Sequence, residues 1–86
     1  MNEKRSDTRT AFRAGVRMTH PTAGAHILKT RDMSHTGAYL LTRDEIGLQL
    51  KDQVTIQSID IDDAPIIEAE IVRIEAGGFA VRYLLD

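Results

Sequence analysis

Residues 12–19 have the sequence Phe-Arg-Ala-Gly-Val-Arg-Met-Thr, in which apolar and polar side chains alternate strictly. Val16 and Met18 fall on one parity, and Arg17 falls on the other. Successive side chains of a β-strand point to opposite faces, so this pattern predicts a strand with one buried face. The rest of the chain is best interpreted outward from this strand.

The same short alternation recurs along the chain between groups of turn-forming residues. Residues 21–24 (Pro-Thr-Ala-Gly) and the pair Gly77-Gly78 are the clearest turn signals. At Val72 the apolar parity slips by one position, which predicts a β-bulge or a barrel corner. Residues 42–45 match a helix capping box, but Gly47 follows so closely that we expect at most one helical turn. The expected strands are residues 12–18, 25–30, 38–41, 53–59, 66–75 and 79–85.

Six short strands joined by turns, with no helical span of ten residues, predict an all-β fold. A six-stranded antiparallel β-barrel is favoured over a sandwich, because closing the sheet removes exposed strand edges. We expect one domain over residues 1–86, with the barrel formed by residues 11–86 and little or no C-terminal helix. Residues 1–10 contain no apolar side chain except Met1 and are expected to form a flexible arm.

Length and composition exclude several classes of protein. A chain of 86 residues is too short for separate cofactor and substrate domains. It has no cysteine, so disulfides and thiolate metal sites are excluded, and a cytoplasmic location is expected. It also lacks the run of 18 apolar residues that a membrane-spanning helix needs.

The net charge of −2 conceals an uneven distribution. Residues 1–43 carry eight basic and three acidic side chains, a balance of +5, whereas residues 44–86 carry three basic and ten acidic ones, a balance of −7. The first half therefore favours an anionic partner. A small anion fits better than a nucleic acid polymer, which the acidic half would repel.

Two polar motifs flank the apolar strands. Arg5 and Arg9 are spaced as R-x-x-x-R, and Asp32, Ser34 and Gly37 are spaced as D-x-S-x-x-G. Arginine offers a planar fork that matches phosphate oxygens and the guanine acceptors O6 and N7. Aspartate can accept from guanine nitrogens, serine can bind phosphate or base, and glycine allows close backbone approach or a positive φ. Taken singly, the first motif is more often a solvated basic tail, and the second is more often an Asx-type turn.

In this order and spacing the two motifs resemble the signature of the PilZ domain family. The resemblance extends to the strand that follows Arg9 and to the ending Gly77-Gly78-Phe79-Ala80-Val81-Arg82-Tyr83, which is similar to the family pattern G-x-G-h-R-F. Ala80 stands where many members have glycine. A second R-x-x-x-R frame, Arg9 to Arg13, is disfavoured because Arg13 lies within the first predicted strand.

The resemblance implies a β-barrel that binds the bacterial second messenger cyclic di-GMP. Carried over, Arg5 and Arg9 are the clamp for the ligand, and Asp32, Ser34 and Gly37 are the surface that receives it. Lys4, which precedes the first arginine, is expected to influence how the ligand is held. The resemblance leaves open whether one ligand molecule or an intercalated pair is bound.

The resemblance further implies that the ligand-bound arm signals to a downstream protein in motility, pilus or exopolysaccharide control. No cofactor is expected besides the ligand. A ligand-independent adaptor of pilus or motility machinery is the alternative, as for members that lack the motifs. Because the chain stops soon after the last predicted strand, a partner or a second copy in a homodimer is a candidate cover for the open end of the barrel.

Catalytic and metal chemistry find no support in the sequence. His20, His26 and His35 have no metal-ligand spacing and are expected to be surface or strand histidines. We therefore expect that the chain is not an enzyme and that it has no metal site. A third alternative, an oligonucleotide-binding barrel, needs exposed aromatic rings, and Tyr39 is the single candidate that the strand pattern leaves for that role.

Overall fold

The computed structural model describes residues 10–11, 14–42 and 46–84. The described residues form seven strands and contain no helix: β1 (Thr10–Ala11), β2 (Gly15–His20), β3 (Gly24–Met33), β4 (Gly37–Leu41), β5 (Gln53–Ser58), β6 (Ile67–Glu75) and β7 (Gly78–Tyr83). No helix long and apolar enough to cross a membrane is therefore found in these ranges. Lys4, Arg5 and Arg9 lie outside the described residues.

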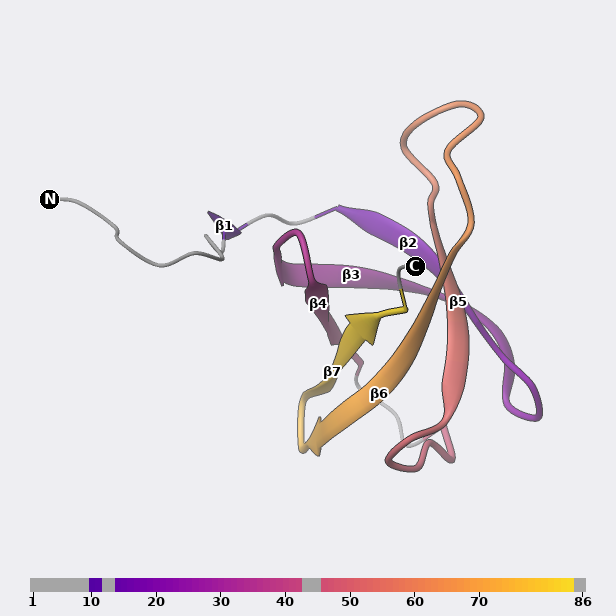
Figure 1. Ribbon diagram of the computed structural model, residues 1–86, viewed down its shortest axis with the longest axis vertical. Coiled ribbons are helices and arrows are strands. Elements are labelled where there is room, and N and C mark those ends of the chain that lie inside the picture. Colours follow the sequence, from indigo (N-terminus) through magenta and orange to yellow (C-terminus); the bar gives the residue numbers. More distant parts are fainter. Residues whose placement is uncertain (1–9, 12–13, 43–45, 85–86) are drawn as a thin grey trace, which may run out of the picture.

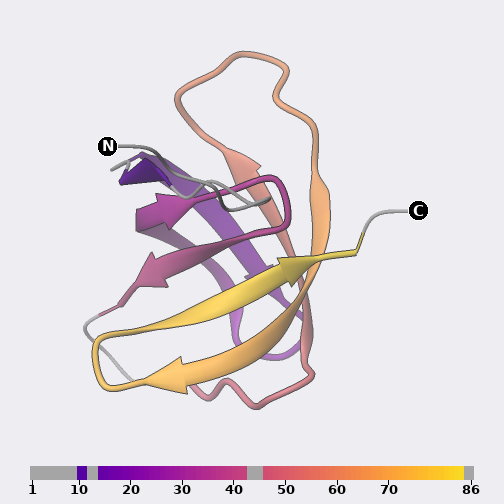
Figure 2. The ribbon, with the colours of Figure 1, turned by 60° about the vertical axis from the view of Figure 1, so that its left-hand side comes forward.

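The strands close into a six-stranded antiparallel barrel, as predicted. The order along the sheet is β3-β2-β5-β6-β7-β4, and β4 returns to pair with β3, which completes the ring (Figure 1). The short strand β1 pairs with the last two residues of β3, on the side of β3 along which β2 pairs with its earlier residues (Figure 2). The turns that precede and follow β3 lie at opposite ends of that strand, so the barrel has two distinct ends.

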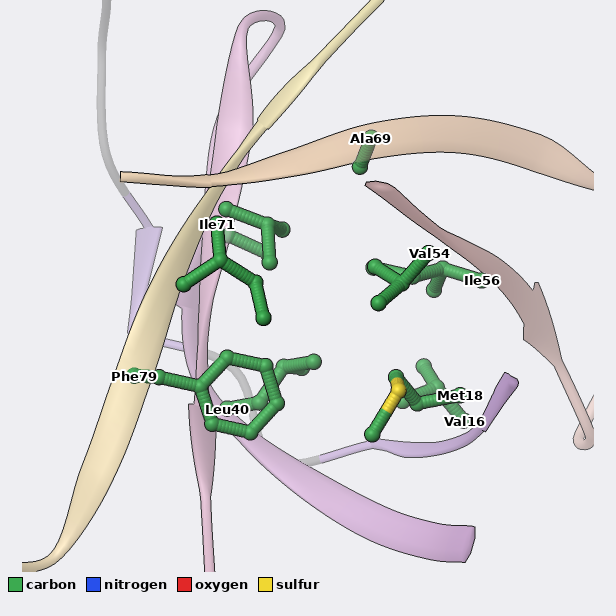
Figure 3. Packing of buried hydrophobic residues seen from close by; sticks show 10 residues of the cluster. Val16, Met18, Leu40, Val54, Ile56, Ala69, Ile71 and Phe79 are labelled. Carbon is green, nitrogen blue, oxygen red and sulfur yellow. The ribbon is translucent and has the colours of Figure 1, made fainter. Parts of the chain in front are cut away.

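Side-chain alternation fills the barrel. On β2, Val16 and Met18 are buried, whereas Arg17 and Thr19 are exposed, as the sequence predicts. Similar alternation from five strands brings ten buried apolar side chains together (Figure 3). These are Val16, Met18, Ala38, Leu40, Val54, Ile56, Ala69, Ile71, Phe79 and Val81.

The bulge predicted at Val72 is present. The register of β6 against β7 runs from Ile71 opposite Val81 directly to Arg73 opposite Ala80, so Val72 is the additional residue. Ile71 is fully buried, and Val72 is 47% exposed. The bulge thus explains why the apolar parity of this strand slips.

Strand β3 differs from the prediction, because it continues to Met33 instead of ending at Thr30. Its last residues gain partners on both sides: Asp32 pairs with Ala11 of β1 and with Tyr39 of β4. The β3–β4 register also shifts between Thr30 and Asp32. Asp32, which was expected between two strands, therefore lies within one. The pairing with β1 is non-local, so local alternation does not reveal it.

The end of the barrel opposite the β3–β4 turn is held by a buried histidine. Nδ1 of His20 accepts hydrogen bonds from the backbone nitrogens of Thr22 and Ala23, at 3.1 and 2.9 Å. Nε2 therefore carries the proton and donates to Asp52 Oδ2 at 2.7 Å. This bond, with a second one from the backbone nitrogen of Gln49, lowers the pKa of Asp52. His20 links β2 to β5 and is a structural residue.

At most one helical turn was expected between β4 and β5, and the part of this connection that the structure describes contains none. Residues 46–49 have no regular secondary structure, and residues 50–51 form a turn. Arg43, Asp44 and Glu45, which contribute most of the expected capping box, lie outside the described residues. The partly buried side chains of Ile46 and Leu48 pack against the core from this connection.

Candidate ligand-binding face

The turn between β3 and β4 contains two of the residues that the sequence singled out. The backbone nitrogen of Ser34 donates to the carbonyl oxygen of Gly37 at 2.9 Å. Ser34 Oγ accepts from the backbone nitrogens of Thr36 and Gly37, at 3.2 and 3.3 Å. Such side-chain bonds to the backbone are typical of serine in turns. Ser34 therefore shapes the turn, and the residue is partly exposed.

Gly37 is required by close packing of two backbones. A Cβ atom placed on it would lie 2.1 Å from the carbonyl oxygen of Val81 on β7. Its φ is not in the left-handed region. Of the two reasons offered for a glycine at this position, close backbone approach is the one that the structure supports.

Asp32 lies beside this turn, at the end of β3. Its side chain is 15% exposed, and its Oδ2 accepts from Nε of Arg31 at 3.0 Å. The structure thus brings Asp32, Ser34 and Gly37 together on one hairpin.

Strand β1, which contains the first residues that the structure describes, pairs with the same hairpin. Thr10 pairs with Met33, and Ala11 pairs with Asp32. Thr10 directly follows Arg9 in the sequence, so the described chain meets the hairpin one residue after the predicted clamp.

A hollow of about 550 Å³ opens next to this hairpin, on the outer face of the barrel. Thr36 and Gly37 line it from the hairpin. Three arginines, Arg31, Arg73 and Arg82, line it from β3, β6 and β7. Each has a carboxylate partner: Arg31 binds Asp32, Arg73 binds Glu75, and Arg82 binds Glu70. The hollow is therefore rich in guanidinium groups, but much of their charge is balanced locally.

The sequence analysis did not identify these three arginines as site residues. Each occurs on a strand as an isolated basic side chain, which is common on protein surfaces. Two features of the register bring them together: Gly37 pairs with Arg82, and the bulge on β6 aligns Arg73 with Ala80. The predicted bulge was the one available signal that Arg73 faces outward.

Tyr39 is not an exposed stacking residue, contrary to the role that an oligonucleotide-binding barrel would give it. Its side chain is 3% exposed, because Arg31 covers the ring with Cζ 3.8 Å from the ring centroid. The phenol donates a hydrogen bond to Glu75 at 2.7 Å. Among the other aromatic residues that the structure describes, Phe79 is buried and Tyr83 is partly buried. The described surface thus lacks the exposed aromatic rings typical of single-strand binding.

Metal ligands do not gather elsewhere in the described ranges either. No group of three or more His, Cys, Asp or Glu side chains there is arranged to hold an ion.

Comparisons with known proteins identify a family. The family model described as "PilZ domain" matches residues 3–86. No curated protein matches the chain. Among solved structures, the PilZ domain of CeSA from a cellulose-synthesizing bacterium aligns with a TM-score of 0.72 and 23% identity, covering 92% of this chain and 82% of that one. The Bacillus subtilis inhibitor of motility, MotI/DgrA, aligns with a TM-score of 0.74 and 15% identity, covering 98% of this chain and 44% of that one.

Proposed function

Because this chain belongs to the PilZ domain family, we propose that it is a receptor module that binds cyclic di-GMP and catalyses no reaction. The observation that carries the proposal is the pairing of Thr10 and Ala11 with Met33 and Asp32. This pairing connects the chain that contains Arg5 and Arg9 to the hairpin that contains Ser34 and Gly37. The pairing supports the proposal because it holds the residues that follow Arg9 beside this hairpin, where we propose that the two parts of the family motif act together.

In this proposal each motif residue has a distinct chemical task. Arg5 and Arg9, with Lys4, clamp the two phosphates and the acceptor edge of guanine, because guanidinium forks match both. Asp32 accepts from the guanine nitrogens. Ser34 and Gly37 let the ligand lie close to the backbone of the turn.

We further propose that binding transmits a signal through the arm. The ligand carries two negative charges, which neutralise the basic side chains of residues 1–9 and fix this segment on the barrel face. The altered face is then recognised by a downstream protein. The names of the two structural neighbours refer to cellulose synthesis and to motility, and outputs of this kind are the ones that we propose. Such a receptor acts in the cytoplasm.

The experiment that tests this function is a calorimetric titration of the purified chain with a panel of nucleotides. We expect saturable binding of cyclic di-GMP, with much weaker binding of cyclic di-AMP, GMP and a short single-stranded RNA. Cyclic di-AMP has the same charge and ring but lacks the guanine edge, so it isolates base recognition. The molar ratio at saturation distinguishes one bound ligand from an intercalated pair.

Two outcomes would contradict the proposal. Absence of heat with cyclic di-GMP at high micromolar concentration would favour the ligand-independent adaptor. Equal binding of all four ligands would indicate nonspecific attraction of anions.

A further inference from the structure

Arg31 occupies an unusual position for a surface arginine, because two contacts fix its guanidinium plane. One face lies on the ring of Tyr39, with Cζ 3.8 Å from the ring centroid. One edge is held by Asp32, which accepts from Nε at 3.0 Å. The side chain is nevertheless 47% exposed. A group that is normally mobile is thus oriented before any ligand arrives.

The tyrosine beneath Arg31 is itself held firmly. Its phenol donates a hydrogen bond to Glu75 at 2.7 Å. Burial of the ring and, to a smaller extent, this hydrogen bond raise the pKa of Tyr39, so the phenol stays protonated. Gly78 leaves room for the ring, since a Cβ at that position would lie 2.7 Å from Cε1 of Tyr39. The ring is therefore a rigid support for the guanidinium.

Arg31 also lines the hollow, beside Thr36 and Gly37 of the turn. A flat guanidinium that is half exposed in a hollow of this size offers a stacking surface for a planar base. It is less suited to bind phosphate, because Asp32 already occupies one edge and neutralises its charge. Stacking leaves both the Asp32 bond and the Tyr39 contact intact.

We propose that Arg31, supported by Tyr39, is a stacking platform for one guanine base of the ligand. This inference rests on the proposed function and adds a residue outside the two sequence motifs. It requires a planar cation at position 31, whereas a purely electrostatic role requires a positive charge alone.

The substitution Arg31→Lys separates these two roles, because lysine keeps the charge and loses the plane. We expect Arg31→Lys and Arg31→Ala to weaken cyclic di-GMP binding by similar factors, on the order of tenfold. The matched control is Arg17→Lys, which alters an exposed arginine on β2 outside the hollow and should leave affinity unchanged. Melting curves without ligand verify that each variant is folded.

A spectroscopic measurement gives an independent test. In the wild-type chain, the Nε–H proton of Arg31 should shift upfield on saturation, because a stacked purine adds its ring current to that of Tyr39. If the wild type binds cyclic di-GMP and Arg31→Lys binds it equally well, the proposed stacking role of Arg31 is wrong. The same holds if the Nε–H resonance does not move on saturation. In both cases the proposed receptor function is unaffected. If the wild type does not bind cyclic di-GMP, both the receptor function and the platform are overturned.

Discussion

Replacing Gly37 by alanine is expected to remove much of the folding stability of this domain. The new Cβ would lie 2.1 Å from the carbonyl oxygen of Val81, which is a backbone atom and cannot rotate away. Overpacking typically costs 1 to 3 kcal/mol, and a clash with backbone in a closed barrel should reach about 3 kcal/mol or more. A domain of this length has roughly 4 to 13 kcal/mol in total. We expect the melting temperature to fall by roughly 12 °C or more.

The chain contains a matched control for this substitution. Gly77 also lies next to β7, but a Cβ there would meet no atom within 4 Å, and its φ is not positive. Gly77→Ala should therefore melt within a few degrees of the wild type, as followed by circular dichroism. A Gly37→Ala variant that melts like Gly77→Ala would show that β4 and β7 do not approach as described.

The second large effect concerns ligand affinity. We expect the double substitution Arg5→Ala/Arg9→Ala to weaken cyclic di-GMP binding by at least roughly 30-fold, since each guanidinium contact with guanine or phosphate is worth about 1 kcal/mol or more. The melting temperature without ligand should not change, because the ring from β2 to β7 forms without residues 1–9. Calorimetric titration measures the affinity.

A double variant of equal charge provides the control for this effect. Arg17→Ala/Lys29→Ala also removes two positive charges, but from exposed positions on β2 and β3 that do not line the hollow. Its affinity should remain within about twofold of the wild type at physiological salt, where surface charges are screened. If both double variants lose affinity equally, binding depends on overall charge. That result would contradict a specific role for Arg5 and Arg9.

Most of the fold could be predicted from the sequence, because each barrel strand has its own pattern. The alternation around Val16 and Met18 and the slip of parity at Val72 are local features, and the structure agrees with both. The turn predicted at Gly77-Gly78 lies one residue earlier, at Ala76-Gly77, because Gly78 already begins β7. The prediction failed for the end of β3. Asp32 and Met33 pair with Ala11 and Thr10 of β1, which are distant in sequence, and no local pattern indicates that pairing.

The candidate site could be predicted only in part, because the register of the strands decides which side chains lie together. Asp32, Ser34 and Gly37 form a short motif on one hairpin, so their spacing alone indicates that they lie together. Arg31 and Tyr39 come together through the register of β3 and β4, in which Asp32 pairs with Tyr39. The short apolar run at residues 38–41 predicts a strand that is buried on both faces or lies at a sheet corner, and Tyr39 is indeed buried, beneath Arg31.

The most direct test of the account is to map where cyclic di-GMP binds, using backbone amide signals of the isotope-labelled chain. We predict that the signals of residues 32–38 shift or broaden on titration, and that those of residues 21–24, in the turn at the other end of β3, stay unchanged. Shifts centred on residues 21–24, or no shifts at a saturating ligand concentration, would contradict the claim that the β3–β4 hairpin receives the ligand.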